Sequence, residues 1–113
     1  MISVVVPVFN EEESVNHFYD ELKKLLPSFL KENEIIFIDD GSSDSSWNVI
    51  EEISTANNFI KGIKFRRNYG KSAALNVGFA ASAGNVVITM DADLQDSPEE
   101  IPELYKMITE GKY

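Results

Sequence analysis

Four short apolar runs recur along the chain, and each is followed by polar residues and then by a segment with helical spacing. The first two runs, ISVVVPV at 2–8 and IIFI at 35–38, are continuously apolar, and weaker runs cover 60–65 and 86–90. Continuously apolar strands are typical of parallel sheets that are covered on both faces. The runs therefore predict a mostly parallel sheet of about four strands.

Helical patterns separate and follow these strands. Apolar residues recur every three or four positions from Val15 to Phe29, which predicts a first helix over about 11–31. Asn10 and Glu13 have the spacing of a capping pair at its start. Further helices are predicted through Ile50, from about 71 to 84, and from Ser97 onward. The order βαβαβαβα predicts an α/β fold with right-handed crossovers and helices that flank the sheet.

Length, charge and cysteine content narrow the class of protein. The 113 residues suffice for a single domain, 1–113, and are too few for two of ordinary size. Ten Lys and Arg against nineteen Asp and Glu give a net charge of −9, which argues against a nucleic-acid partner or an anionic membrane surface. The absence of cysteine excludes disulfides, zinc–thiolate sites and thiol catalysis. No apolar run approaches the roughly 20 residues that span a bilayer, and we expect a cytoplasmic location.

Polar residues follow every predicted strand. In chain order they are Asn10-Glu11, Asp39-Asp40, Arg66 to Lys71, and Asp91-Ala92-Asp93. In open α/β sheets, ligands bind beyond the carboxyl ends of the strands. Because parallel strands end at the same edge, the four polar segments predict one site there.

The last of these segments has the chemistry of a metal site. Asp91 and Asp93 are one residue apart and can turn both carboxylates toward one cation, and Gln95 could add an amide oxygen. Oxygen ligands suit Mg²⁺ or Mn²⁺, which commonly complete their shell with substrate phosphates and water. A solvated turn is the alternative for an isolated D-x-D, but the position directly after a buried strand favours the metal.

The acidic pair after the second strand has two interpretations. Asp39 and Asp40 could accept hydrogen bonds from a nucleobase or a ribose, or they could serve as Asx residues that stabilise the turn. For Asp44 and the neighbouring serines, capping is the preferred interpretation.

The basic segment after the third strand could bind phosphate. Arg66, Arg67 and Lys71 precede or begin a helix whose first N–H groups favour anions, and Lys71 is the best single candidate. A solvated basic loop is the alternative. Gly70-Lys71-Ser72 does not complete a P-loop, because Phe65 stands where that motif requires glycine.

Taken together, four blocks resemble the family 2 glycosyltransferases of GT-A fold. They are VVPVFNEEE at 4–12, IIFIDDGSSD at 35–44, RRNYGKSAALNVGF at 66–79 and MDADLQDSPEEIPEL at 90–104. The last block is most similar to the branch with dolichol-phosphate mannose synthases and bacterial polyprenyl-phosphate glucosyl transferases. The resemblance covers nearly the whole chain and implies a Rossmann-like nucleotide-binding half of a GT-A domain.

The resemblance also implies roles for individual residues. It places a first nucleotide-binding segment at Pro7, Phe9, Asn10 and Glu11, with Phe9 where tyrosine is frequent. It implies that Asp39 and Asp40 contact the uracil or guanine and its ribose. It places Lys71 in a basic loop near the nucleotide, where Arg66 stays a candidate for the phosphates on its charge. It assigns the metal to Asp91, Asp93 and Gln95, with Ala92 between the two carboxylates.

The implied activity is metal-dependent transfer of a sugar, with inversion, from a UDP- or GDP-linked donor to a polyprenyl phosphate or glycan acceptor. Family members continue past the equivalent of Tyr113 into an acceptor-binding half that carries the general base. We therefore expect the base beyond Tyr113, membrane contact only through such further segments, and nucleotide binding without efficient turnover in this chain.

Two alternatives belong to other classes. One is a non-catalytic nucleotide-binding or assembly module, in which an exposed apolar face would allow self-association into a homo-oligomer. The other is a phosphotransfer domain that uses Asp91 and Asp93 as nucleophile and acid. Haloacid-dehalogenase-like enzymes place such a pair after the first strand and usually have Thr or Val where Gln95 stands, which disfavours this alternative.

Overall fold

The computed structural model describes residues 1–25 and 29–92 of the chain. In order, the elements are β1 (Ile2–Val8), α1 (Glu12–Leu25), α2 (Phe29–Glu32), β2 (Glu34–Asp39), α3 (Ser46–Ala56), β3 (Ile60–Lys64), α4 (Lys71–Ala81) and β4 (Val86–Thr89). The four predicted strands are confirmed, as are the helices after the second and third. The predicted last helix lies outside the described residues.

Within the described residues, the helix predicted over about 11–31 is represented by α1, over Glu12–Leu25, and by the short helix α2, over Phe29–Glu32. Residues 26–28, which the prediction also included, lie outside the described residues.

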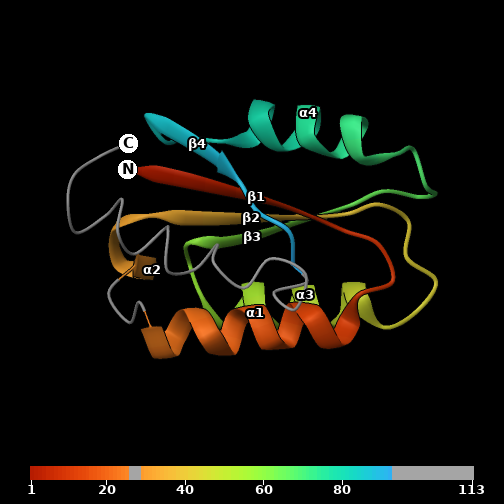
Figure 1. The fold of residues 1–113 in the computed structure, drawn as a ribbon, viewed down its shortest axis with the longest axis horizontal. Helices are drawn as coiled ribbons and strands as arrows, with labels where there is room; N and C mark the ends of the chain where they lie inside the picture. Colours follow the sequence, from red (N-terminus) through yellow and green to blue (C-terminus); the bar gives the residue numbers. More distant parts are fainter. Residues whose placement is uncertain (26–28, 93–113) are drawn as a thin grey trace.

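All strands of the described sheet are parallel, in the order β3-β2-β1-β4. The chain first steps outward from β1 to β2 and β3, and then crosses to the other side of β1 to form β4 (Figure 1). The strand order thus reverses between β1 and β4. In open α/β sheets, such a switch point opens a crevice at the carboxyl ends of the two strands, where ligands bind.

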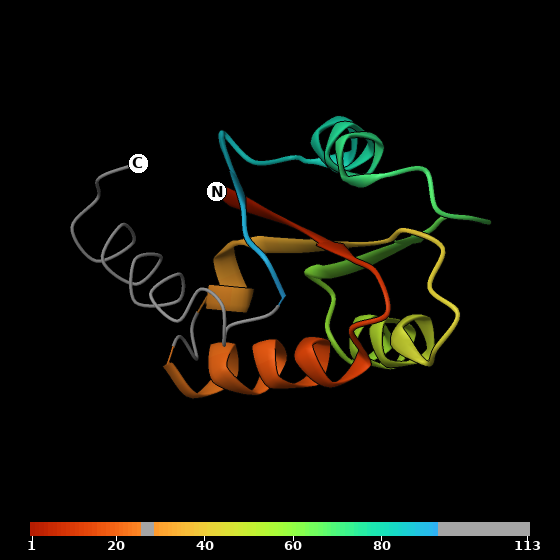
Figure 2. The same ribbon diagram turned by 45° about the vertical axis from the view of Figure 1, so that its right-hand side comes forward.

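Helices cover both faces of the sheet. α1 and α3 lie on one face and α4 lies on the other, while the loops after β1, β2 and β3 extend from the same edge (Figures 1 and 2). Among the described helices, none has the length and apolar character needed to cross a bilayer.

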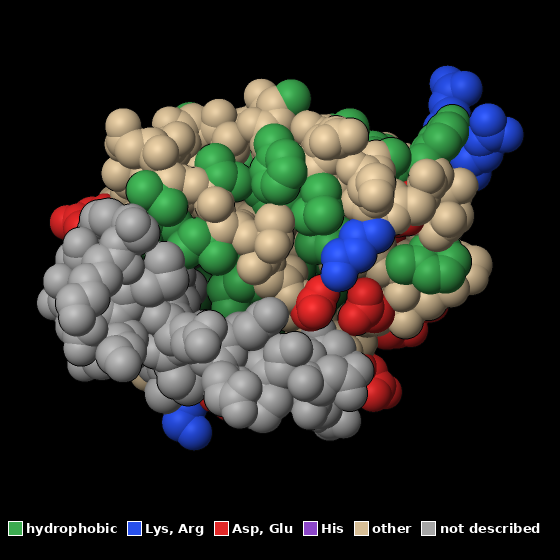
Figure 3. Space-filling model, turned by 45° about the horizontal axis from the view of Figure 1, so that its top comes forward, with side chains coloured by type: hydrophobic (Ala, Val, Ile, Leu, Met, Phe, Trp, Pro, Cys, Tyr) green, Lys and Arg blue, Asp and Glu red, His purple; other side chains and the backbone are tan. Residues whose placement is uncertain are grey.

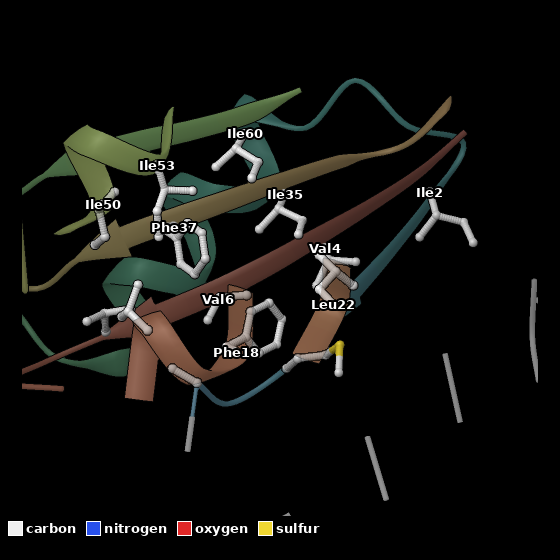
Figure 4. Close-up of a cluster of buried hydrophobic side chains, with 14 residues drawn as sticks. Ile2, Val4, Val6, Phe18, Leu22, Ile35, Phe37, Ile50, Ile53 and Ile60 are labelled. Atoms are coloured by element: carbon white, nitrogen blue, oxygen red, sulfur yellow. The ribbon is translucent and has the colours of Figure 1, made fainter. Parts of the chain in front are cut away.

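Alternate side chains of the central strands fill two apolar clusters, because successive residues of a strand point to opposite faces. The larger cluster lies against α1 and α3 and contains Val4, Val6 and Phe37 (Figure 4). The rings of Phe18 and Phe37 meet there edge to face, with centroids 5.9 Å apart. The smaller cluster lies against α4 and contains Val5, Ile36, Ile38 and Ala74.

Small residues let α4 approach the sheet closely. Gly78 faces β1 so tightly that a Cβ there would overlap with the side chain of Val5. Ala74 is fully buried one turn earlier. This packing fixes the first residue of α4, Lys71, above the carboxyl edge of the sheet.

A buried carboxylate ties the opposite edge together. Glu34 Oε1 accepts hydrogen bonds from Ser3 Oγ and from the Ala83 N–H, both at 2.7 Å, and Glu34 Oε2 lies 3.0 Å from Lys61 Nζ. Burial opposes ionisation of Glu34, but the hydrogen bonds from Ala83, Ser3 and Lys61 outweigh it and lower its pKa. The network links β1, β2 and β3 to the connection between α4 and β4.

Candidate functional site

The loop after β1 is fastened to the loop after β2 through Asn10. Asn10 adopts a left-handed backbone conformation with φ of 51°, which asparagine tolerates better than most residues. Its Oδ1 accepts hydrogen bonds from the Ser43 N–H (2.8 Å) and the Asp44 N–H (3.3 Å), and its own N–H donates to Ser42 Oγ (2.8 Å). The predicted capping of α1 by Asn10 and Glu13 is therefore wrong, because the Asn10 side chain caps the neighbouring turn instead.

Asp44 holds the starts of two helices. Its Oδ1 accepts a hydrogen bond from the Ser46 N–H at 2.9 Å, and its Oδ2 accepts one from the Glu12 N–H at 3.5 Å. Slight burial opposes ionisation of Asp44, but the hydrogen bonds from Ser46 and Glu12 outweigh it and lower the pKa of the carboxyl. The capping predicted for Asp44 is confirmed, whereas Ser45, directly before α3, makes no side-chain capping hydrogen bond.

Asp39 stabilises the turn that follows its own strand. It is fully buried, and its Oδ1 accepts a hydrogen bond at 3.2 Å from the Ser42 N–H, three residues further along the turn. Its Oδ2 is buried and has no hydrogen-bond partner within the part of the chain that the structure describes. Of the two interpretations left open by the sequence, the structure shows for Asp39 the stabilisation of the turn, through a bond to the third residue and not through an Asx turn.

Asp40 anchors the segment that leads into α4. Its carboxylate accepts hydrogen bonds from the Tyr69 N–H (2.8 Å), the Gly70 N–H (3.1 Å) and Asn68 Nδ2 (3.2 Å). Gly70 has φ of 101°, a conformation that favours glycine. The segment before Lys71 is thus held by β2 over a sequence distance of about 30 residues.

Gly41 allows the same two loops to touch. It has φ of 74°, and a Cβ there would overlap with the backbone of Arg67 and Asn68. Beyond this contact the Arg67 guanidinium lies over the ring of Tyr69, at 5.0 Å from its centroid. Arg66 and Arg67 are both exposed.

A cleft of about 180 Å³ opens at the switch point between β1 and β4. Its described lining comprises Pro7, Val8, Phe9, Glu11, Asp40, Lys71 and Asp91. An adjoining hollow of about 80 Å³ shares Pro7, Lys71 and Asp91 and adds Thr89 and Met90. The ends of β1, β2 and β4 and the start of α4 therefore converge, as the sequence predicted.

One ion pair crosses this cleft. Lys71 Nζ lies 3.3 Å from Asp91 Oδ1, and the two side chains are 65% and 49% exposed. Figure 3 shows basic and acidic side chains side by side on this face, next to an apolar surface. Within the described lining of the cleft, Lys71 is the basic residue among the carboxylates of Glu11, Asp40 and Asp91.

The structure separates the predicted site residues into groups. Those that line the cleft are Pro7, Phe9, Glu11, Asp40, Lys71 and Asp91. Asn10 and Asp39 hold the adjacent loops, Arg66 is exposed away from the described lining, and Ala92 is buried in the larger apolar cluster. Asp93 and Gln95 lie outside the described residues. Sequence analysis missed Thr89 and Met90, whose position just before Asp91 was the available signal.

A second, acidic hollow of about 410 Å³ lies near the start of α1. It is lined by Asn10, Glu11, Glu12, Glu13, Ser14 and Asp44. Its lining includes four carboxylates and no basic side chain, so it would repel an anionic ligand. The cleft at the switch point is the better candidate for a phosphate-bearing ligand.

The donor set at the cleft fits a hard cation. Among the described residues no group of three or more His, Cys, Asp or Glu could by itself enclose a metal ion. Asp91 nevertheless offers a half-exposed carboxylate that already pairs with a cation, the Lys71 ammonium. Carboxylate oxygens suit Mg²⁺ and Mn²⁺, which use few protein ligands when substrate phosphates supply the others.

The chain belongs to glycosyl transferase family 2, because a sequence model of this family matches residues 3–113. The mannosyltransferase PcManGT from Pyrobaculum calidifontis, solved in complex with GDP-Man and Mn²⁺, is similar with a TM-score of 0.72 and 21% identity, over 81% of this chain and 27% of that one. This similarity confirms the predicted α/β fold.

Two further solved structures are similar. S. aureus TarS 1–349 in complex with UDP-GlcNAc matches with a TM-score of 0.69 and 26% identity, over 90% of this chain and 31% of that one. Glucosyl-3-phosphoglycerate synthase from Mycobacterium tuberculosis was solved in complex with Mn²⁺, UDP and glucosyl-3-phosphoglycerate. It matches with a TM-score of 0.67 and 25% identity, over 96% of this chain and 39% of that one. The chain thus spans between 27% and 39% of the lengths of these three structures.

Proposed function

We propose that the cleft between β1 and β4 binds the diphosphate of a nucleoside-diphosphate sugar together with a divalent cation, as the donor-binding part of a glycosyltransferase. The observation that carries the proposal is the convergence of Asp40, Lys71 and Asp91 on one cleft at the switch point of the sheet. Membership of glycosyl transferase family 2 supports it, as do similar structures that contain UDP or GDP-Man and Mn²⁺.

The residues of the cleft have distinct roles in this proposal. Asp91 would ligate the cation, with Asp93 and Gln95 as further ligands. When bound, the cation offsets the charge that develops on the leaving diphosphate. Lys71 adds a positive charge beside the phosphates, and it lies at the start of α4, whose N–H groups favour anions. The exposed ring of Phe9 offers an apolar surface for the base.

The size of the cleft limits what it holds. Sites for small molecules usually enclose about 300–1,000 Å³, whereas this cleft measures about 180 Å³. It accommodates a diphosphate and a cation, and the base and the sugar would extend over the surrounding surface. We infer that the chain binds nucleotide weakly and without efficient turnover.

The acceptor is the finer part of the proposal. The resemblance of the 90–104 block favours a polyprenyl phosphate, with a glycan as the second class, and an inverting reaction. The general base would come from residues other than those of the described cleft. The identity of the acceptor and of the general base does not affect the proposal for the donor site, which has its own test.

Isothermal titration calorimetry of the full chain with UDP and with GDP, in the presence and absence of Mn²⁺, tests the proposed function. We expect binding of at least one nucleotide that requires the metal, and weaker binding that Mn²⁺ no longer enhances in Asp91→Asn. The matched control is Asp20→Asn, which removes an exposed carboxylate from α1. Absence of binding, or binding that Mn²⁺ does not affect, would contradict the proposal.

A further inference from the structure

Lys71 forms an ion pair with Asp91 just after the end of β4. We propose that Lys71 is an internal counter-ion of Asp91 that moves to the phosphates when nucleotide enters, so that nucleotide and metal bind cooperatively. The inference rests on the proposed function and deepens it, because it assigns a regulatory role to the ion pair rather than a second ligand site. Lys71 would influence the cation through Asp91, the carboxylate for which both compete.

The geometry of the pair permits the exchange. Lys71 Nζ is 3.3 Å from Asp91 Oδ1, a distance at which a divalent ion and the ammonium would compete for the same carboxylate. Both side chains are about half exposed or more, so the ammonium can leave without crossing packed protein. Lys71 also lines both the cleft and the adjoining hollow, which places phosphates in the cleft within its reach.

The backbone around Lys71 is fixed, so the exchange needs a movement of one side chain only. Asp40 holds the N–H groups of Tyr69 and Gly70, the two residues directly before Lys71. The tight contact of Gly78 with Val5 holds α4 against the sheet. Rotation of a long lysine side chain at an exposed site takes place within nanoseconds, so it would not slow binding.

The free energy needed to break the Lys71–Asp91 pair explains why the pair couples the binding of the two ligands. Either ligand alone must break the Lys71–Asp91 pair, because the metal takes the carboxylate and the nucleotide takes the ammonium. When both bind, the pair is broken only once, so the ligand that binds second does not have to break it. Exposed ion pairs are weak, and their strength corresponds to about a two- to five-fold change in an equilibrium constant. By thermodynamic reciprocity, each ligand should raise the affinity of the other by this factor, beyond their direct attraction.

The test measures Mn²⁺ binding by the loss of its free-ion electron paramagnetic resonance signal, with and without saturating UDP or GDP. In Lys71→Met, we expect metal-only affinity to rise about two- to five-fold and the enhancement by nucleotide to fall by a similar factor. Lys71→Arg keeps the charge and should resemble the wild type. Lys24→Met is the matched control, because it removes an exposed lysine near the far end of α1.

Asp91 provides the second comparison. If Asp91 restrains Lys71, Asp91→Asn should raise the metal-free affinity for nucleotide, measured by calorimetry, about two- to five-fold in the chain that keeps Lys71 and leave it unchanged in Lys71→Met, whereas a general change of charge would raise it in both. Unchanged metal affinity and unchanged coupling in Lys71→Met would overturn the inference and leave the proposed function standing. A wild-type chain that binds Mn²⁺ and nucleotide neither alone nor together would overturn both.

Discussion

Replacing Glu34 by glutamine should destabilise the fold by about 2–3 kcal/mol at neutral pH. Glu34 is 2% exposed, and its Oε1 accepts the hydrogen bonds of Ser3 and Ala83 at 2.7 Å each. Hydrogen bonds to a charged acceptor contribute about 1.5–3 kcal/mol and neutral ones about 0.5–1.5 kcal/mol, so the loss is about 1 kcal/mol per bond. The half-exposed Lys61 turns to solvent and adds up to ~1 kcal/mol.

The loss of stability caused by Glu34→Gln should depend on pH, and it should be largest at neutral pH. The pKa of Glu34 is lowered in the folded chain, so its ionised form stabilises the fold above the unfolded-state pKa of about 4.3, and this contribution disappears as the pH falls through the lower folded-state value. Wild type and Glu34→Gln should therefore differ by a constant amount above about pH 5 and converge in more acidic solution.

Urea unfolding of both chains between pH 7 and pH 3 measures this difference. Glu32→Gln is the matched control, because it neutralises an exposed carboxylate two residues away and should change the free energy of unfolding by less than about 0.5 kcal/mol. A cost below about 0.5 kcal/mol for Glu34→Gln at pH 7, or a difference that persists undiminished at pH 3, would refute the reasoning.

Three further predictions concern the elements that position the cleft. Gly78→Ala should destabilise the fold by about 1–3 kcal/mol in urea unfolding, because the added methyl group overlaps with Val5, and an unchanged midpoint would count against that contact. Asp40→Asn should speed amide hydrogen exchange at Tyr69 and Gly70, whose N–H groups lose a charged acceptor, while equal protection would contradict the anchoring role. Asn10→Ala should destabilise by about 1–3 kcal/mol and Asn10→Gly by less, since glycine tolerates the positive φ; the reverse order would disprove the strain argument.

The sequence predicts the strands and the location of the site because these depend on short-range patterns. The apolar runs containing Val4 and Ile36 had to be buried on both faces, and their polar exits had to share one edge. The convergence of Asp40 and Asp91 on one cleft follows from this arrangement alone.

The sequence could not predict how the loops interlock. The side chain of Asn10 bonds to residues 43 and 44, and that of Asp40 bonds to residues 68–70, across about 30 positions of the chain. Such contacts depend on the relative placement of neighbouring strands, which no local pattern encodes. For the same reason the pairing of Lys71 with Asp91 became visible only in three dimensions.

The most direct test of the account asks where a bound cation lies when nucleotide is present. Mn²⁺ added with UDP or GDP broadens the amide resonances of nearby residues in nuclear magnetic resonance spectra. The account predicts that broadening is strongest around Val8, Asp40, Lys71 and Asp91, which line the cleft. Broadening centred on the acidic hollow at Glu12–Ser14, with these positions unaffected, would contradict it.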